Sequence, residues 1–352
     1  MVAKFLEQVW YFGAWADELS PGGVKNVILA DRDIALYRTE TGELAAIGNQ
    51  CPHRFAPLHI GKVKGEALEC LYHGLRFGPS GRCVLSPHHN GAVPGAIRVP
   101  SYTAVERHGI VWLWLAQDAE PQPDLIPDLS DYAAMPESVV VRVPLIPVNA
   151  NYQLLVDNLL DPSHGDFLHY GSIGDGRLSS RSPALTMGDN WMKADWSFDG
   201  VNPMPFLETV YSEPGVYDTW MDVRWFAPGI IRFEAGIKPS GMARQDGRWS
   251  VSYHFCMPST EQTTHYDVRL VRNYDVDNLA MTESLVDAAV QAFVAEDKMM
   301  LELQQGQMKG RDFWEMGPTL LPPDVPAVKV RRQLQSMIAA EASSERVATF
   351  AD

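Results

Sequence analysis

The chain has 352 residues, of which 46% are hydrophobic and 21% charged, which is enough for roughly two globular domains and unlike the composition of disordered or collagenous proteins. The 44 acidic residues outnumber the 29 basic ones, and the net charge of −15 opposes binding to nucleic acids or anionic membranes. Four cysteines are too few for a secreted disulfide framework, so metal binding in a reducing compartment is the better expectation. The N-terminus lacks the pattern of a signal peptide, and no apolar run reaches the roughly 18 residues of a membrane span, so we expect a cytoplasmic protein.

The first third of the chain predicts a small all-β domain. Short runs rich in β-branched and aromatic residues lie at 27–30, 34–38 and 109–116, with turn residues between them. A segment crowded with Pro and Asp follows at 119–131 and does not fit a regular element, because proline removes a backbone donor and restricts the residue before it. We therefore expect a domain boundary there, with the first domain at residues 1–118.

The rest of the chain, residues 119–352, predicts an α+β domain. Alternating apolar and polar residues predict strands of one sheet at 219–226, 229–237, 249–257 and 264–274. Helical patterns cover about 151–169, 282–305 and 328–342. No P-loop is present and no GxGxxG motif follows a strand, so we expect no bound nucleotide. A redox enzyme with this sequence would take its electrons from another protein.

Two pairs of cysteine and histidine form the first candidate metal site. Cys51-Pro-His53 is followed after 16 residues by Cys70-Leu-Tyr-His73, so each of two loops supplies one thiol and one imidazole. A structural zinc site usually takes both ligands of a pair from one residue type, whereas a Rieske [2Fe–2S] cluster has two Cys on one iron and two His on the other. The Rieske arrangement fits best, and a zinc site or unrelated buried cysteines are the alternatives. The remaining cysteines are expected to be buried as small apolar residues: Cys83 and Cys256.

The second candidate metal site begins in a leucine-rich segment that carries Asn158, Asp161, His164 and His169 within twelve positions. Burying such polar groups without partners costs roughly 1 to 3 kcal/mol each, and a bound metal is one reason for their presence. Two histidines five residues apart do not share a face of a regular helix, and Pro162 removes a helical donor. We therefore expect the helix to distort at this point.

A carboxylate in the predicted helix 282–305 is the third candidate ligand. Asp297 lies three residues after Val294 and four after Phe293, so it shares their apolar stripe and needs a cation or hydrogen-bond donors. Two histidines and one carboxylate form the facial triad of non-haem Fe(II) oxygenases, and a buried salt-bridge cluster is the alternative. The neighbouring Glu296 is the rival ligand and is expected to be a solvated residue.

These motifs resemble those of Rieske non-haem iron oxygenases over nearly the whole chain. The segment CPHRFAPLHIGKVKGEALECLYHGLRF is similar to the family's cluster-binding segment, and NLLDPSHGDFLH and AFVAEDKMMLE are similar to the segments that bind its catalytic iron. The resemblance implies an N-terminal all-β Rieske domain, followed by a catalytic domain of the helix-grip type with an antiparallel sheet and helices. It implies that the [2Fe–2S] ligands are Cys51 and Cys70 on one iron and His53 and His73 on the other. It also implies that the ligands of a mononuclear Fe(II) are His164, His169 and Asp297.

By the same resemblance, Asp161 connects the two metal centres. Members of the family form head-to-tail homotrimers in which this residue hydrogen-bonds to its own His164 and to His73 of the neighbouring subunit. A cap for the turn at Pro162 is the local alternative for Asp161. Asn158 opens the same Asn-x-x-Asp-x-x-His motif.

The resemblance is strongest to the branch typified by vanillate O-demethylase and dicamba monooxygenase. It implies the terminal oxygenase component of a monooxygenase that uses O₂ to O-demethylate a methoxylated aromatic acid, giving a phenol and formaldehyde. A separate NADH-dependent reductase or a ferredoxin would supply the electrons. N-demethylation, methyl-group hydroxylation and ring dihydroxylation use the same metals and remain alternatives. A non-catalytic Rieske electron carrier is a more remote one.

Substrate contacts are expected from the predicted sheet. His254 occupies the position of a histidine that contacts the substrate carboxylate in the dicamba enzyme. Phe233 occupies the position of its companion Asn, and because an apolar ring cannot hydrogen-bond a carboxylate, we expect a different acid or a differently placed acid group. Arg224 and Arg232 are nearby cations, although strand alternation points Arg232 and Phe233 to opposite faces.

Overall fold

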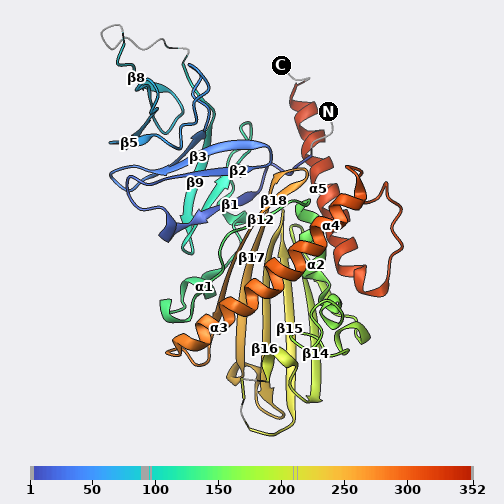
Figure 1. The fold of residues 1–352 in the computed structure, drawn as a ribbon. Coiled ribbons are helices and arrows are strands. Elements are labelled where there is room, and N and C mark those ends of the chain that lie inside the picture. The colour runs from blue at the N-terminus through green and yellow to red at the C-terminus, as the bar shows by residue number, and fades with distance from the viewer. Residues whose placement is uncertain (1–3, 89–94, 96, 209, 212, 350–352) are drawn as a thin grey trace. The chain divides into compact units, whose positions relative to one another are not determined.

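The computed structural model describes residues 4–88, 95, 97–208, 210–211 and 213–349 (Figure 1). The chain divides into two compact units, one comprising Met1–Ala133 with Ala340–Asp352 and the other Ala134–Ala339. The Pro-rich segment at 119–131 belongs to the first unit, and the domain ranges 1–118 and 119–352 remain a proposal. None of the helices in the described residues has both the length and the apolarity needed to cross a membrane.

Antiparallel strands build the first unit. Within its described residues, six strands form one sheet in the order β1-β10-β9-β4-β3-β2, and four form another in the order β5-β6-β7-β8. The larger sheet comprises β1 (Trp10–Trp15), β2 (Val24–Leu29), β3 (Arg32–Arg38), β4 (Leu44–Gly48), β9 (Ser101–Arg107) and β10 (Ile110–Trp114). The smaller sheet comprises β5 (Lys62–Lys64), β6 (Ala67–Glu69), β7 (Arg76–Phe77) and β8 (Cys83–Leu85). Short helical segments are η1 (Ala16–Glu18), η3 (Pro123–Leu125) and α1 (Ser130–Ala133).

Aromatic strands form the core of the larger sheet. Every residue of β1 and β10 is buried, and the two strands pair with Trp10 opposite Trp114, whose rings lie 5.4 Å apart. Burying one large apolar side chain contributes about 1.5 to 3 kcal/mol, so these strands contribute strongly to stability. The strands predicted at 27–30, 34–38 and 109–116 are confirmed.

One antiparallel sheet dominates the second unit. Eight strands of its described residues take part, in the order β11-β18-β17-β16-β15-β14-β13, with β12 also paired to β18. The strands are β11 (Val141–Arg142), β12 (Ile146–Val148), β13 (Ala184–Met187), β14 (Trp191–Val201), β15 (Tyr217–Phe226), β16 (Ile230–Pro239), β17 (Arg248–Thr260) and β18 (Thr263–Arg272). The four strands predicted in this region are confirmed as β15 to β18.

The first helix of the second unit is shorter than the sequence predicts. α2 (Tyr152–Leu160) begins at the N-cap Asn151, whose side chain accepts a hydrogen bond from the Gln153 amide. It ends before Pro162, and a 3-10 turn, η5 (Pro162–Asp166), follows. The predicted distortion at Pro162 is confirmed, but the prediction that the helix extends to about residue 169 is wrong, because proline cannot donate to the helix.

The second long helix is interrupted by a π-helical segment. α3 (Leu279–Val290) crosses one face of the sheet in Figure 1, and η9 (Gln291–Asp297) and α4 (Lys298–Met308) continue it. A π-helical turn changes the angle between successive side chains, so the predicted apolar stripe does not hold at Val294, which is 36% exposed. The antiparallel sheet with a helix across one face confirms the predicted fold class of this domain.

The remaining helices are short, except the last. α5 (Val325–Thr349) extends beyond the predicted 328–342 at both ends. Besides η5, the described 3-10 turns of this part of the chain are η4 (Glu137–Val139), η6 (Leu178–Ser180), η7 (Pro205–Leu207), η8 (Arg244–Asp246) and η10 (Pro322–Asp324). Arg331 of α5 donates to both carboxylate oxygens of Asp157 in α2, at 2.7 and 3.0 Å. This pair, between the buried Arg331 and the half-buried Asp157, fixes α2 immediately before Asn158.

Candidate metal centres

Two loops of the first unit carry the predicted cluster ligands. One loop joins β4 to β5 and the other joins β6 to β7. In each, the cysteine amide donates to the carbonyl five residues later, from Cys51 to Ala56 at 2.9 Å and from Cys70 to Leu75 at 2.8 Å. The two loops therefore hold their cysteines in equivalent turns.

Both turns use a left-handed residue at the fourth position after the cysteine. Phe55 has a φ of 59° and Gly74 a φ of 72°, and each amide donates to the cysteine carbonyl, at 2.8 and 2.9 Å. Glycine adopts this conformation readily, whereas a residue with a Cβ is strained there. A Cβ added at Gly74 would also lie 3.1 Å from Cγ of Pro87.

Gly74→Ala is expected to lower the free energy of unfolding by about 1 to 2 kcal/mol, the usual cost of a left-handed non-glycine residue. The urea midpoint of the metal-loaded protein measures this change. Gly306→Ala in α4 is the control, since a Cβ there meets nothing within 4 Å and φ is not left-handed. This control is expected to stabilise the protein slightly. An unchanged midpoint for Gly74→Ala would show that the turn does not have this conformation.

The four predicted cluster ligands differ in burial, with the two thiols more buried than the two imidazoles. Cys51 and Cys70 are buried, whereas His53 is exposed and His73 half-buried. The two imidazole rings lie 4.4 Å apart, at 67° to each other. Inner thiols and outer imidazoles are the donor set of a Rieske cluster, in which the histidine-bound iron lies nearer to solvent.

The environment of the thiols also fits a cluster. Burial raises the pKa of the Cys51 thiol to about 11, the main-chain N–H groups of His53 and Arg54 counteract this, and the adjacent Cys70 thiol adds to it. Thiolates are the species that bind iron, so a bound cation would supply the charge that ionises the pair. Main-chain N–H groups directed at a ligand sulfur are one of the features that tune the potential of iron–sulfur clusters.

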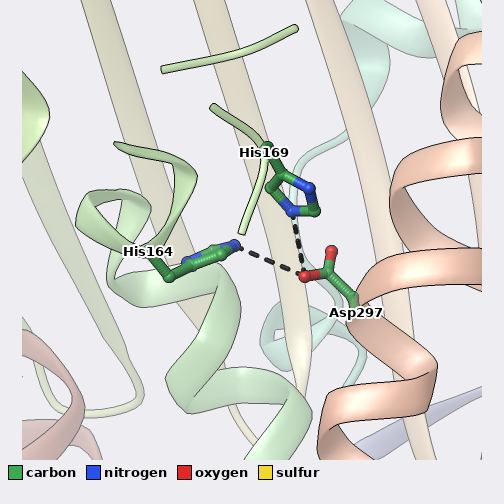
Figure 2. Close-up of side chains that lie close together, drawn as sticks. All are labelled: His164, His169 and Asp297. Atoms are coloured by element: carbon green, nitrogen blue, oxygen red, sulfur yellow. Dashed lines mark hydrogen bonds and ion pairs between the residues drawn. The ribbon is translucent and has the colours of Figure 1, made fainter. Parts of the chain in front are cut away.

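The three predicted iron ligands converge in the second unit (Figure 2). The ligand atoms of His164, His169 and Asp297 all lie within 4.8 Å of one another. Oδ1 of Asp297 is 3.0 Å from Nε2 of His169 and 3.4 Å from Nε2 of His164. His164 lies in η5, His169 follows it, and Asp297 ends η9. Two imidazoles and one carboxylate facing a common point are the donor set of a non-haem Fe(II) facial triad.

Electrostatics keep Asp297 ionised. Burial raises the pKa of this carboxyl, but its hydrogen-bonding and charge interactions with His164 and His169 outweigh burial and hold the pKa well below its ordinary value. His169 is also buried, which lowers its pKa, and the carboxylates of Asp297 and Glu296 raise it above the ordinary value. A buried carboxylate that is anionic at neutral pH suits a hard cation such as Fe(II).

Outer contacts orient both histidines. Nδ1 of His164 donates to the main-chain carbonyl of Asp161 at 2.5 Å, and Nδ1 of His169 donates to the carboxylate of Glu296. Gln291 in turn donates to Glu296 at 2.8 Å. Such contacts fix the tautomer that presents Nε2 to a metal. The expectation that Glu296 is merely solvated is wrong, because the π-helical turn directs it to His169 while its neighbour Asp297 reaches the other ring nitrogen.

Glu296→Gln is expected to weaken iron binding at the triad by about 10 to 100-fold, the usual effect of changing an outer partner of a ligating histidine. The amide can still accept from His169 but carries no charge. Iron retained per chain after dialysis against a graded chelator measures the effect. Glu283→Gln on the exposed side of α3 is the matched control. Equal iron retention in the two variants would contradict a role for Glu296.

Asn158 lies beside the converging ligand atoms of His164 and Asp297. Its Nδ2 donates to Oδ1 of Asp297 at 3.0 Å and is 3.4 Å from Nε2 of His164. Its buried Oδ1 has no partner among the residues that the structure describes. A buried polar atom without a partner beside three potential ligands is consistent with a site built for an additional group.

Asp161 makes a different contact from the one expected. Its carboxylate accepts from the Ser163 amide at 3.0 Å and caps η5, so the predicted local alternative is present. The predicted hydrogen bond between Asp161 and His164 of the same chain is present, but the main-chain carbonyl of Asp161 makes it, and the carboxylate does not. The reason is the cap itself, because the first amides of the turn lack helical partners and attract the carboxylate. The contact with a neighbouring subunit remains a prediction.

A cavity of about 270 Å³ opens beside the triad. The predicted substrate contacts His254 and Phe233 both line it, whereas Arg224 and Arg232 do not. Its walls are mainly apolar, and the larger apolar side chains are Leu159, Ile173, Leu178, Phe206, Met221, Phe233, Leu270, Leu285 and Phe293. A cavity of roughly 150 Å³ can hold benzene, so this one is large enough for a substituted aromatic ring.

His254 belongs to a hydrogen-bonded chain that the sequence did not predict. Its Nδ1 lies 2.6 Å from the hydroxyl of Tyr266, and its Nε2 lies 2.7 Å from Oγ of Ser252. Burial lowers the pKa of His254 to about 3, so the imidazole is neutral at neutral pH. Ser252 and His254 are two residues apart on β17 and therefore share a face, which is the sequence signal that could have identified Ser252.

Comparison with known proteins gives consistent results for both parts of the chain. Residues 9–103 match the family model "Rieske [2Fe-2S] domain", and residues 148–340 match "Vanillate O-demethylase oxygenase C-terminal domain". The chain is 36% identical to the chloroacetanilide N-alkylformylase oxygenase component of Rhizorhabdus wittichii, over 99% of both proteins. It is 32% identical to the dicamba O-demethylase oxygenase component of Stenotrophomonas maltophilia, over 96% of this chain and 99% of that protein. The crystal structure of dicamba monooxygenase bound to dicamba superimposes with a TM-score of 0.87 at 31% identity, covering 96% of this chain and 99% of that one.

Proposed function

Because the chain belongs to the Rieske oxygenases and is a terminal oxygenase component, we propose that it removes the methyl group from an aromatic methyl ether. Its cofactors are a Rieske [2Fe–2S] cluster and a mononuclear iron. The observation that carries the proposal is the apolar cavity directly beside His164, His169 and Asp297. A ring held by these walls places a methoxy substituent next to the iron ligands.

The ligand assignments are part of this proposal. Equivalent turns, buried thiols and adjacent imidazoles support a cluster on Cys51, His53, Cys70 and His73. Convergent ligand atoms, an ionised Asp297 and the unpaired Oδ1 of Asn158 support an iron on the facial triad. A pure electron carrier would leave this second donor set and its cavity without a role.

When bound, the iron and the cluster supply the activation of O₂ and the delivery of electrons. The net reaction is ROCH₃ + O₂ + 2H⁺ + 2e⁻ → ROH + HCHO + H₂O, in which O₂ accepts four electrons, two from the methyl carbon and two from an external reductant. The sequence has no nucleotide-binding motif, so a separate NADH-dependent reductase or a ferredoxin is the proposed electron source. The apolar walls exclude water and hold the ring, and Asn158 and Glu296 hold the ligands in place.

N-dealkylation is the second candidate reaction. It is favoured by the 36% identity to a chloroacetanilide N-alkylformylase, while the O-demethylases for dicamba and vanillate favour the first. Both reactions hydroxylate a carbon attached to a heteroatom, and the product then releases an aldehyde. Methyl-group hydroxylation and ring dihydroxylation would release none.

Single turnover distinguishes these reactions without a natural reductase. Metal-loaded protein is reduced chemically, mixed with O₂ and an aryl methyl ether or an N-methyl anilide, and assayed for formaldehyde. We expect formaldehyde from the ether in proportion to the reduced protein. Aldehyde from the anilide alone would favour N-dealkylation. A hydroxylated or diol product without aldehyde would contradict both candidates.

We further propose that the oxygenase forms a homotrimer in which Asp161 contacts His73 of the neighbouring subunit and links the two metal centres. Asp161→Asn is expected to keep both metals but to slow product formation by about 10 to 100-fold. Asparagine caps a turn as well as aspartate does, so η5 is retained and only the charge is lost. Asp161→Ala, which also removes the cap, is expected to lower the free energy of unfolding by about 1 kcal/mol. A normal single-turnover yield and rate in Asp161→Asn would refute the linking role.

A further inference from the structure

The cavity beside the triad has no lysine or arginine among its described lining residues. Its lining carboxylates are Glu296 and Asp297, and its remaining titratable groups are the imidazoles of His164, His169 and His254. The two carboxylates balance the two positive charges of an Fe(II) held by the triad. No positive charge is then left for a substrate anion, and burying an unpaired carboxylate is strongly unfavourable.

The neighbouring arginines do not change this balance. Arg232 is next to Phe233 in β16, and successive strand residues point to opposite faces, so only Phe233 faces the cavity. Nη1 of Arg232 pairs with Glu234 at 3.1 Å. The guanidinium of Arg224 packs over the ring of Trp191 at 5.8 Å. Neither cation reaches the substrate cavity.

One hydrogen-bonded chain, which ends at Ser252, supplies a polar contact of this cavity. The other uncharged polar residues of its described lining are Asn158, Ser172, Ser250 and Gln291. The buried Tyr266 hydroxyl lies 2.6 Å from Nδ1 of His254, and because its hydrogen has no other acceptor among the described residues, we assign this nitrogen as the acceptor. A neutral imidazole has one donor and one acceptor, so Nε2 then donates to Oγ of Ser252. Among the residues that the structure describes, the Ser252 hydrogen is then left with only the Phe233 carbonyl at 3.5 Å, which is a long contact. Ser252 lines the cavity and can therefore donate to a ligand.

We propose that the substrate of this oxygenase is an uncharged aromatic compound, an aryl ether or anilide, in which one neutral oxygen accepts a hydrogen bond from Ser252. This inference rests on the proposed function and replaces the aromatic acid expected from the sequence. A neutral oxygen needs one donor, which Ser252 provides, whereas a carboxylate needs a cation or several donors. The apolar walls bind the ring, and the hydroxyl selects its orientation.

Matched ligands test the inference through binding. The anaerobic, metal-loaded enzyme is titrated calorimetrically with 2-, 3- and 4-methoxybenzamide and with the corresponding methoxybenzoates, which differ in charge but little in shape. We expect the amide to bind at least tenfold more tightly than its acid for at least one ring position. If no amide of the set binds more tightly than its acid, the inference is wrong.

Two variants test the residues. Ser252→Ala is expected to weaken binding of the preferred amide about three to tenfold, the effect of losing one neutral hydrogen bond, and to leave binding of toluene unchanged. Phe233→Lys adds a cation to the wall and is expected to bring the acid to equal or tighter binding than the amide. Unchanged amide binding in Ser252→Ala would remove Ser252 from the proposal.

Formaldehyde release is measured separately on the same ligands. Preferential binding of an amide without formaldehyde from it would contradict O-demethylation and leave the uncharged substrate class intact. Formaldehyde from an acid that binds more tightly than its amide would support O-demethylation and contradict the uncharged substrate class.

Discussion

His164→Ala is expected to lower product formation to below about one hundredth of the parent rate, beyond the 10 to 100-fold effect typical of outer partners of a metal ligand. The visible spectrum of the cluster should be unchanged, because His164 lies in the second unit and the cluster ligands lie in the first. Product formation is lost because the variant lacks the Nε2 of His164, which lies 3.4 Å from Oδ1 of Asp297 where the three ligands converge (Figure 2). Single-turnover product analysis combined with the visible spectrum measures both effects.

Iron analysis makes this test specific. His164→Ala should retain the sulfide and lose the mononuclear iron. His265→Ala on β18, which does not line the cavity, is the control and should retain both. An active His164→Ala protein with full iron content would contradict the assignment of His164 as a ligand.

Cys70→Ser is expected to abolish the visible colour of the protein while the mononuclear site keeps its iron. A serine hydroxyl does not replace a thiolate as a ligand of a Rieske cluster. Turnover should disappear as well, because the cluster supplies electrons. The visible spectrum and the acid-labile sulfide content measure this result.

Cys83→Ser provides a matched control. Cys83 is also a buried thiol of the first unit, and its Sγ donates to the Leu85 carbonyl at 3.3 Å. A serine there can keep that hydrogen bond, so the colour should remain. A coloured Cys70→Ser protein, or a colourless but folded Cys83→Ser protein, would reverse the assignment of the cluster ligands.

Local spacing explains which features were predictable from the sequence. The two Cys and His pairs each lie within four residues, so one turn brings each pair together regardless of the rest of the fold. The distortion at Pro162 was predictable because the missing proline amide acts locally. The four central strands of the second unit follow from their alternating residues. Cys83 and Cys256 are buried as predicted.

Features that depend on non-standard helical geometry were not predictable. The apolar stripe assumed a regular α-helix, but the π-helical segment Gln291–Asp297 exposes Val294 and directs Glu296 to His169. The carboxylate of Asp161 does not contact His164, because the Ser163 amide in the next turn donates to it instead. The π-helical segment has no distinctive residue pattern in the sequence, whereas the cap made by Asp161 was expected as the local alternative.

Contacts between strands explain why the polar chain of the cavity was missed. His254 pairs with Val268, so Tyr266 lies diagonally opposite on β18 and its hydroxyl reaches the imidazole. Strand register fixes this contact, and the register is not encoded in the periodicity of either strand alone. The position of His254 in the cavity was predicted, but its partners and its neutrality required the structure.

The account depends most directly on two iron centres in one chain, and metal analysis of anaerobically purified protein tests this. Iron, zinc and acid-labile sulfide are measured per chain alongside the visible spectrum. One Rieske cluster and one facial-triad site predict about three irons and two sulfides per chain. Zinc without sulfide would contradict the account.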